Sequence, residues 1–157
     1  MSLAHRRGAF SCGEPALDEY IRQYARQQQT RGLNRTYVAL VVEAGDIAGY
    51  YSINASSVLT ADFPSELKLP RYPVPALRIG RLAVDTRFQG HGLGHLLLRH
   101  SFNLALEMAE RVGIFAVVVD AKHAQATAFY KKLGFAGFAD RPLSLYLPLG
   151  TLAAAKG

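Results

Sequence analysis

Apolar residues recur along this chain with two different periods, and these periods predict alternating helices and strands. An apolar stripe at helical spacing predicts a helix from Pro15 to about Gln29, and a second stripe predicts one from Leu93 to about Arg111. The first stripe consists of Leu17, Tyr20, Ile21 and Tyr24, and the second of Leu93, Leu97, Leu104 and Met108. A shorter helix is expected from Ala124 to Leu133, ended by Gly134.

Runs of β-branched and apolar residues predict the strands. We expect them at 36–42, 47–54, 77–84, 114–119, 135–138 and 143–149. Gly45-Asp46 is typical of a hairpin turn between the first two. The uninterrupted apolar run 114–119 favours a strand buried on both faces and paired in parallel. Together with 77–84 and the intervening helix it predicts a right-handed β-α-β unit, so the fold class is α/β with a mixed, mostly antiparallel sheet.

The segment from Ser56 to Pro75 shows neither period. It contains four prolines, at positions 64, 70, 73 and 75, and we expect at most a short helix near 64–67. A proline-dense stretch of this length inside a compact domain is often functional.

Length and composition fit a single globular domain spanning residues 1–157. Half of the residues are hydrophobic and 19% are charged, which excludes a disordered chain. No apolar run is long enough for a membrane helix, and residues 1–7 lack an apolar signal core. Cys12 is the only cysteine, so a cytoplasmic protein is expected. His91 and His95 are four residues apart but lack a nearby carboxylate, so no metal site is predicted.

The chain is basic, with 18 Lys and Arg against 12 Asp and Glu and a net charge of +6. Such a balance suits nucleic acid or an acidic protein, but it also occurs on a generic surface. The arginines fall into two clusters, which are Arg22, Arg26, Arg31 and Arg35, and Arg71, Arg78, Arg81 and Arg87.

The most informative segment is the glycine-rich stretch that joins the strand 77–84 to the helix beginning at Leu93. Gly90, Gly92 and Gly94 alternate there, leaving backbone N–H groups bare where the helix dipole favours an anion. A phosphate-bearing ligand is therefore expected. The alternative is a tight turn that uses glycine only for positive φ.

Spacing excludes two common phosphate loops. A dinucleotide fingerprint needs G-x-G-x-x-G, but His95 stands where the third glycine is required. A P-loop ends in Lys followed by Ser or Thr, whereas this stretch continues His95-Leu96.

What fits is Gln89-x-x-Gly92-x-Gly94, which resembles the acyl-CoA pyrophosphate motif of the GNAT N-acetyltransferases. The shifted frame Arg87-x-x-Gly90-x-Gly92 also matches, but the first frame places Leu93 and Leu97 inward. The resemblance implies a GNAT fold, with acetyl-CoA held where the central parallel strands splay. The implied acetyl-CoA contacts are Leu82, Ala83, Val84, Gln89, Gly90, His91, Gly92, Leu93, Gly94, His95 and Tyr130.

A second motif, Ala126-x-x-Phe129-Tyr130-x-x-x-Gly134-Phe135, resembles the A-x-x-F-Y-x-x-x-G-F signature of the same family. Phe129 and Leu133 would form its buried face. The resemblance implies that Tyr130 is catalytic and protonates the departing CoA thiolate. From the residues alone, a packed tyrosine with its hydroxyl in water is the alternative. His123 stands where the family often has Asn, which leaves the role of that position open.

The resemblance extends from Gly8 to Leu149 and narrows to the GNAT toxins of bacterial toxin–antitoxin modules. The segments that carry it are Phe10-x-Cys12-Gly13-x-Pro15-x-Leu17-Asp18-x-Tyr20, Gly49-Tyr50-Tyr51, Pro70–Pro75, Gly80–Asp85 and Val119-Asp120-Ala121. It implies acetylation of the amino group of aminoacyl-tRNA, inhibition by a ribbon-helix-helix antitoxin, and a homodimer. The implied tRNA contacts are Arg22, Arg26, Arg31, Arg35, Arg78 and Arg81.

Other functions remain open from the sequence. The acceptor could be a small amine or a protein N-terminus, or the domain could bind CoA without catalysis. Backbone N–H groups near Val84 would stabilise the oxyanion. No Asp or Glu is assigned as general base, because an α-amino group with a pKa of about 7.7–8.0 could transfer its proton to water.

Overall fold

The computed structural model describes residues 9–41, 45–138 and 141–156. The chain groups into two compact units, described one at a time below. The first contains the chain up to Asn54 together with 80–100, and the second contains 55–79 and the chain from Ser101 onward. Gly8 and the end of the expected strand 36–42, at position 42, lie outside the described residues, as does the segment 1–7.

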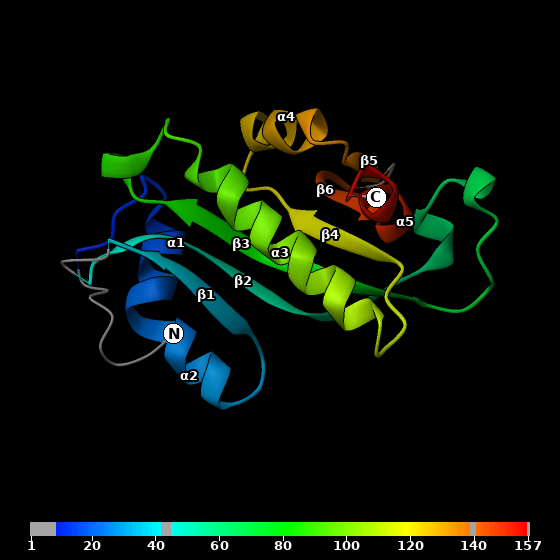
Figure 1. Cartoon of the computed structure of the whole chain (residues 1–157), viewed down its shortest axis with the longest axis horizontal. Helices are drawn as coiled ribbons and strands as arrows, with labels where there is room; N and C mark the ends of the chain where they lie inside the picture. The colour runs from blue at the N-terminus through cyan, green and yellow to red at the C-terminus, as the bar shows by residue number, and fades with distance from the viewer. Residues whose placement is uncertain (1–8, 42–44, 139–140, 157) are drawn as a thin grey trace. The chain divides into compact units, whose positions relative to one another are not determined.

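The first unit opens with a helical segment in three pieces. These are α1 (Pro15–Glu19), a π-helical turn (Tyr20–Tyr24) and α2 (Ala25–Thr30), and α2 packs beside β1 (Figure 1). The expected helix is therefore confirmed, but its stripe is wrong at Tyr24, which is 42% exposed, while Ala25 is fully buried. The N–H of Ala25 donates to the carbonyl of Tyr20, five residues back, and this wider turn shifts the buried face by one residue.

An antiparallel hairpin follows, formed by β1 (Arg35–Leu40) and β2 (Ile47–Val58). Gly45 has the positive φ that its turn requires, so the predicted hairpin is confirmed. The buried cluster of this unit comprises Phe10, Leu17, Tyr20, Ile21, Ala25, Ile47, Tyr50 and Ala83.

Parallel pairing occurs in the second unit, where β3 (Val74–Val84) pairs with β4 (Ala116–Asp120) from Ala76↔Ala116 to Ile79↔Val119. β4 also pairs antiparallel with β6 (Arg141–Pro148), which in turn pairs with β5 (Ala136–Phe138). The strand order is β1-β2-β3-β4-β6-β5, which confirms the mixed sheet.

Helix α3 (Leu93–Ala109) begins where predicted, but its buried stripe differs. Met108 is 38% exposed, whereas Ser101 and Ala105 are fully buried. Small residues let the helix backbone approach its neighbours closely, so they occupy the buried face in place of larger ones.

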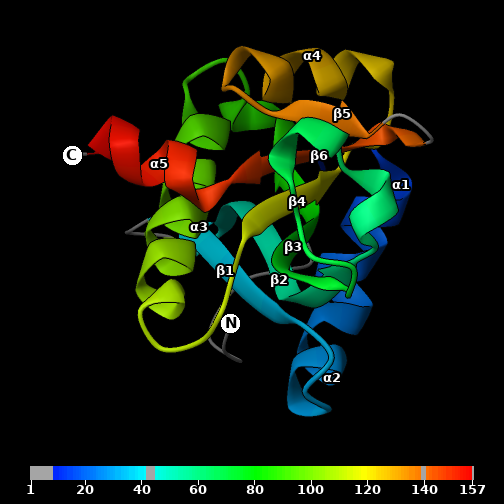
Figure 2. The same ribbon diagram turned by 90° about the vertical axis from the view of Figure 1, so that its right-hand side faces the viewer.

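Helix α4 (Ala124–Lys132) is followed closely by Gly134, whose φ of +100° confirms the predicted stop. It packs on β6, as does α5 (Leu149–Lys156), which the sequence analysis missed (Figure 2). No helix within the described ranges is long and apolar enough to cross a membrane.

The proline-rich segment folds around two short 3-10 turns, Thr60–Asp62 and Ser65–Leu67, the second of which confirms the expected short helix. Phe63 anchors it in the buried cluster of the second unit. That cluster comprises Val58, Phe63, Val74, Ala76, Val118, Phe138 and Tyr146.

Candidate active site

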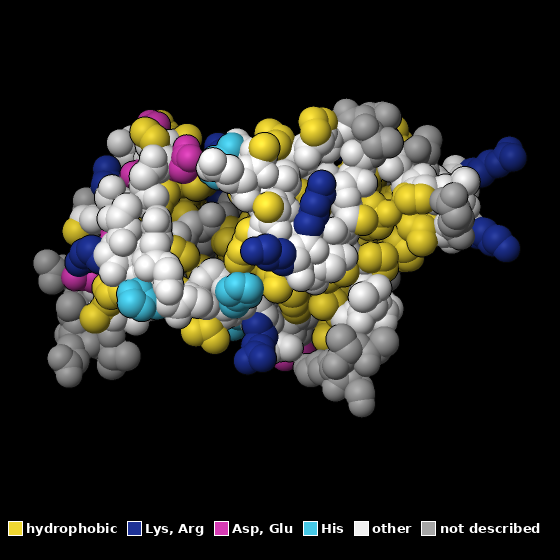
Figure 3. Space-filling view, turned by 90° about the horizontal axis from the view of Figure 1, so that it is seen from above, with side chains coloured by type: hydrophobic (Ala, Val, Ile, Leu, Met, Phe, Trp, Pro, Cys, Tyr) yellow, Lys and Arg dark blue, Asp and Glu magenta, His cyan; other side chains and the backbone are white. Residues whose placement is uncertain are grey.

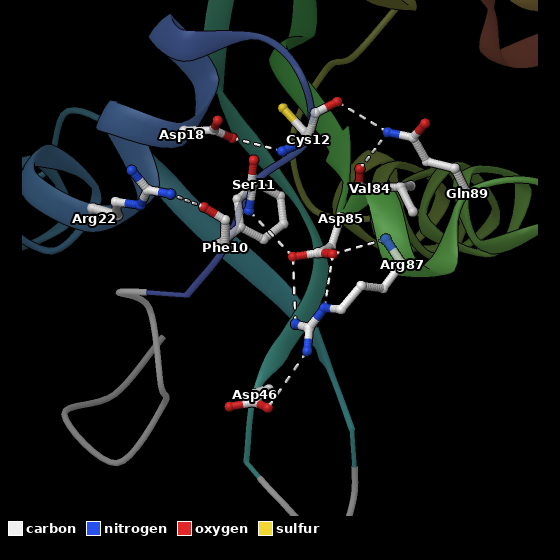
Figure 4. Close-up of polar contacts among 10 residues, drawn as sticks. All are labelled: Phe10, Ser11, Cys12, Asp18, Arg22, Asp46, Val84, Asp85, Arg87 and Gln89. Atoms are coloured by element: carbon white, nitrogen blue, oxygen red, sulfur yellow. Dashed lines mark hydrogen bonds and ion pairs between the residues drawn. The ribbon is translucent and has the colours of Figure 1, made fainter.

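The glycine-rich stretch of the first unit is preceded by a buried carboxylate, Asp85. It is 1% exposed, and its Oδ1 accepts hydrogen bonds from the Arg87 N–H at 2.9 Å and from Arg87 Nε at 3.0 Å. Its Oδ2 accepts from the Ser11 N–H at 3.1 Å (Figure 4). Asp85 therefore caps the 3-10 turn Thr86–Phe88 and joins it to the N-terminal segment.

These contacts keep Asp85 ionised. Burial alone would raise the pKa of its carboxyl, but the hydrogen bonds from Arg87 and Ser11 and the charge of Arg87 outweigh it, so the pKa is lowered. Asp85 is not among the site residues predicted from the sequence. An Asp directly after a strand and two residues before an arginine is nevertheless a recognisable turn-capping pattern.

Gln89 also holds the loop in place. Its side-chain nitrogen donates to the carbonyls of Cys12 and Val84, both at 2.9 Å (Figure 4). The predicted acetyl-CoA contact at Gln89 is thus, in this structure, a support for the loop backbone.

The glycines themselves present open backbone. Gly90 and Gly92 have φ of +83° and +81°, and a Cβ built on either would meet nothing within 4 Å. Helix α3 follows, and the N–H of Leu96 donates to the carbonyl of Gly92 at 3.2 Å. The N–H groups of residues 93–95 have no acceptor within the helix, because they precede its first complete turn. The exposed backbone of the loop and these donors together fit a phosphate group.

The start of α3 is pressed against the sheet at Gly49. A Cβ there would lie 3.0 Å from the Ala83 carbonyl oxygen and 3.1–3.2 Å from methyl carbons of Leu97 and Leu93. The inward placement of Leu93 and Leu97 is confirmed. Among the remaining expected contacts, Ala83 is buried, Leu82, Val84 and Gly94 are half-buried, and His91 and His95 are exposed.

Tyr130, on α4 in the second unit, is 5% exposed. Its ring makes edge-on contacts with Phe129 and Phe135, with centroids 5.3 Å and 5.6 Å away. Phe129 and Leu133, expected to form the buried face, are only half-buried. That prediction was wrong, because the ring contacts make Tyr130 more buried than either.

Burial raises the pKa of Tyr130, and the negative charge of Asp120 raises it further. Asp120 ends β4 and accepts two hydrogen bonds from Arg78 Nη1, at 2.6 Å and 2.7 Å, and one from Ser144 Oγ at 3.1 Å. Arg78, expected to contact tRNA, is therefore paired with a carboxylate. No local sequence pattern indicates this pair, whose members are 42 residues apart.

His123 has a clear structural role. It is the N-cap of α4, and its Nδ1 accepts a hydrogen bond from the Ala126 N–H at 3.2 Å.

Basic side chains are exposed at the surface (Figure 3). In the first unit, Arg26, Arg31 and Arg35 are exposed, whereas Arg22 donates to the Phe10 carbonyl and the Arg81 guanidinium lies 3.8 Å from the Tyr20 ring centroid. Among the described residues no cluster of His, Cys, Asp and Glu could hold a metal ion.

Comparison with known proteins identifies close relatives. A tRNA-acetylating toxin of Mycobacterium tuberculosis is 38% identical over 141 residues, covering 88% of this chain and 83% of the toxin. A probable toxin TacT of Sinorhizobium fredii is 28% identical, covering 98% of this chain and 90% of that protein.

Among solved structures, AtaT complexed with acetyl-methionyl-tRNAfMet superimposes with a TM-score of 0.93 at 27% identity, covering 99% of this chain and 95% of AtaT. The acetyltransferase (GNAT) family profile matches residues 5–135. The open glycine loop, the protonated tyrosine and the mixed sheet agree with this match, and the chain belongs to the GNAT acetyltransferase family.

Proposed function

We propose that this protein is an acetyl-CoA-dependent N-acetyltransferase that modifies the amino group of aminoacyl-tRNA and acts as a translation-inhibiting toxin. The observation that carries the proposal is the 38% identity with a tRNA-acetylating toxin over 88% of the chain. The AtaT complex with acetyl-methionyl-tRNAfMet supports the same substrate class. A single domain and a cytoplasmic location belong to this proposal.

Acetyl-CoA is the co-substrate and supplies the acetyl thioester. The loop Gln89–His95 would hold its pyrophosphate, because open glycine backbone leads there into the N-terminal turn of α3, whose helix dipole favours an anion. Asp85 and the Gln89 side chain keep the loop in shape before the ligand arrives, which lowers the ordering cost of binding.

The amine nitrogen attacks the thioester carbonyl carbon, a C–N bond forms, and the C–S bond breaks as the tetrahedral intermediate collapses. N–H groups near Val84 would stabilise the oxyanion. Tyr130 gives its proton to the departing sulfur. The raised pKa keeps the Tyr130 hydroxyl protonated near neutral pH, which is the state that a proton donor requires.

The attacking amine must be neutral, and its ordinary pKa leaves a useful neutral fraction near pH 8. The proton that it loses after attack can pass to water. Asp120 is 38% exposed at its side chain and acts electrostatically on Tyr130, so it also offers a carboxylate to which an ammonium group would be drawn. Arg78 and Ser144 fix the orientation of that carboxylate.

The exposed arginines Arg26, Arg31 and Arg35 would contact tRNA phosphates directly. Arg22, Arg78 and Arg81 make internal contacts, so their part in tRNA binding would include holding neighbouring residues of the binding surface in position. An antitoxin partner is supported by the structure of AtaT bound to the C-terminus of antitoxin AtaR. Its ribbon-helix-helix fold and a homodimer are further parts of the proposal.

Labelled acetyl-CoA offered with charged and uncharged tRNA tests the proposal. We expect label only on the amino acid of charged tRNA, and its loss in the double variant Arg26→Glu, Arg31→Glu. The double variant Arg111→Glu, Lys132→Glu, which makes the same charge change at exposed positions in the second unit, is the control for unspecific charge effects. Label on a polyamine or a peptide N-terminus, with every charged tRNA left unmodified, would make the tRNA assignment wrong. If no CoA is released with any amine, the protein is a binding module.

A further inference from the structure

The proline-rich segment in the second unit takes no part in the chemistry described so far, yet it is firmly held. Phe63 is 6% exposed and its ring contacts those of Phe115, Phe138 and Tyr146, with centroid distances of 5.0–5.7 Å. Thr60 Oγ1 lies within hydrogen-bond distance of the carbonyls of Pro70 and Tyr72, at 2.5 Å and 2.9 Å. These contacts tie the two ends of the segment together and fix its outer surface.

That outer surface is unusually apolar. Tyr72 is 64% exposed and Leu59 is 63% exposed. Together with Thr60, Arg71 and Pro73 they line a pocket of about 450 Å³. Phe63 fills the inner side of the segment, so Leu59 and Tyr72 lie on its outer side, where they offer an apolar surface to a ligand.

The chemistry of the pocket favours an unpaired nucleotide. Tyr72 offers an aromatic face, and Arg71 is the only charged residue among the pocket-lining residues. No described residue accepts a hydrogen bond from the Arg71 guanidinium. An exposed aromatic ring beside an available guanidinium is the pairing by which proteins hold single-stranded nucleic acid, the ring stacking on a base and the cation contacting a phosphate. The net charge of +6 favours the same polyanionic partner.

We propose that the pocket formed by Leu59, Thr60, Arg71, Tyr72 and Pro73, named here the 59–73 pocket, binds an unpaired nucleotide at the 3′ end of the tRNA substrate. This inference rests on the proposed function and adds a subsite to it. The aminoacyl group is attached to the unpaired 3′ end, so a pocket that stacks one of its bases would restrict where the amine can go. Its effect is on binding and positioning and not on proton transfer.

Fluorescence anisotropy with uncharged tRNA is the first test, and it needs no catalysis. Tyr72→Leu keeps an apolar side chain but removes the stacking face, and we expect roughly 5- to 150-fold weaker binding. Tyr72→Phe keeps the ring and should bind like the wild type. Val112→Ala, at another exposed apolar residue of the second unit, is the control and should also bind normally. Arg71→Ala should reduce the slope of log affinity against log salt by about 0.7–0.9.

A second readout separates the pocket from general phosphate binding. tRNA that lacks its unpaired 3′ nucleotides should bind wild type and Tyr72→Leu equally, because the stacked base is gone. In the acetylation assay, Tyr72→Leu should raise KM for charged tRNA and leave kcat unchanged.

Wild-type affinity of Tyr72→Leu for intact tRNA would overturn the inference. If tRNA binding is unchanged while Tyr72→Asp reduces the molecular mass in light scattering, the pocket is instead an interface between copies of this chain. If Tyr72→Asp abolishes binding of an antitoxin and leaves tRNA binding unchanged, it is a peptide site. Failure of the wild type to acetylate any charged tRNA would sink the proposed function, and this outcome is distinct from all of these.

Discussion

The glycine loop of the first unit and Tyr130 of the second are held by different physical means. Directed hydrogen bonds hold the loop, since Asp85 accepts them from Ser11 and Arg87 and Gln89 donates them to the carbonyls of Cys12 and Val84. Aromatic contacts hold Tyr130, and its chemistry is set by exclusion from water. A site for a polyanion needs open, pre-aligned N–H groups, whereas a proton donor needs a hydroxyl that keeps its proton until the leaving group takes it.

The largest effect on the glycine loop is expected from substitutions at Gly92. Gly92→Asp should abolish acetyl-CoA binding, because a carboxylate would enter a site built for phosphate and because φ of +81° strains any residue with a side chain. Gly92→Ala adds only the strain, about 1–2 kcal/mol, and should weaken binding by roughly 5- to 30-fold. Calorimetric titration measures both. Wild-type affinity in a folded Gly92→Asp protein would exclude the loop as the site.

Tyr130→Phe tests the second region of the comparison, the buried tyrosine on α4. Only a hydroxyl is removed and the ring contacts remain, so turnover should fall by roughly 10²- to 10⁴-fold while acetyl-CoA affinity is retained. CoA release measures turnover, and calorimetry measures affinity. Near-normal turnover would mean that Tyr130 is packing alone and that water or another group serves as the acid.

Asp85→Ala tests the hydrogen bonds that hold the glycine loop. It removes the acceptor of part-buried hydrogen bonds from Ser11 and Arg87 and should lower the free energy of unfolding by about 1–3 kcal/mol. Asp62→Ala is the control, because its ion pair with Arg141 is partly exposed and should contribute less than about 1 kcal/mol. Urea unfolding at pH 7 compares them, and equal losses would contradict a special role for Asp85.

The stability lost in Asp85→Ala should also depend on pH. The pKa of Asp85 is lowered by folding, so its contribution to stability is present above the pKa of the unfolded chain, about 3.9, and is lost as pH falls through the lower folded value. The stability difference between wild type and Asp85→Ala should therefore shrink in urea titrations below about pH 4. A difference that stays constant down to pH 2 would contradict this assignment.

Burial of Tyr130 predicts that turnover does not fall near pH 10. An ordinary tyrosine loses its proton near pH 10, but burial raises this pKa. Turnover should rise to about pH 8 as the amine becomes neutral, and then stay level to about pH 10.5. A fall centred near pH 10 would show that the Tyr130 hydroxyl is in contact with water.

The elements and the two motifs could be predicted from sequence because each depends on neighbouring residues. The glycine loop, the stop at Gly134 and the hairpin turn at Gly45 are set by local backbone preferences. Tyr24 was misplaced because a π-helical turn leaves no distinct sequence pattern, and α5 was missed because its short alanine-rich segment lacks a clear apolar stripe.

The long-range part of the site could not be predicted. Arg78 meets Asp120 because parallel pairing brings their strands together, and Ser11 meets Asp85 across 74 residues of sequence. Periodicity carries no information on which charged side chains meet across strands. The sequence pattern therefore does not reveal that Arg78 pairs with Asp120, and its contact with tRNA stays a prediction.

Gly49 makes acetyl-CoA affinity adjustable from a position that supplies no phosphate contact. The missing side chain there sets how closely the first turn of α3 approaches β2. One added methyl group would lie within 3.0–3.2 Å of the Ala83 carbonyl oxygen and of two leucines of the helix, so these neighbours would have to move apart slightly. The N–H groups proposed to receive the pyrophosphate belong to that same turn. A population of variants selected for altered acetyl-CoA affinity would therefore be expected to accumulate changes around Gly49, Leu93 and Leu97, which resize the spacing between helix and sheet without touching the loop.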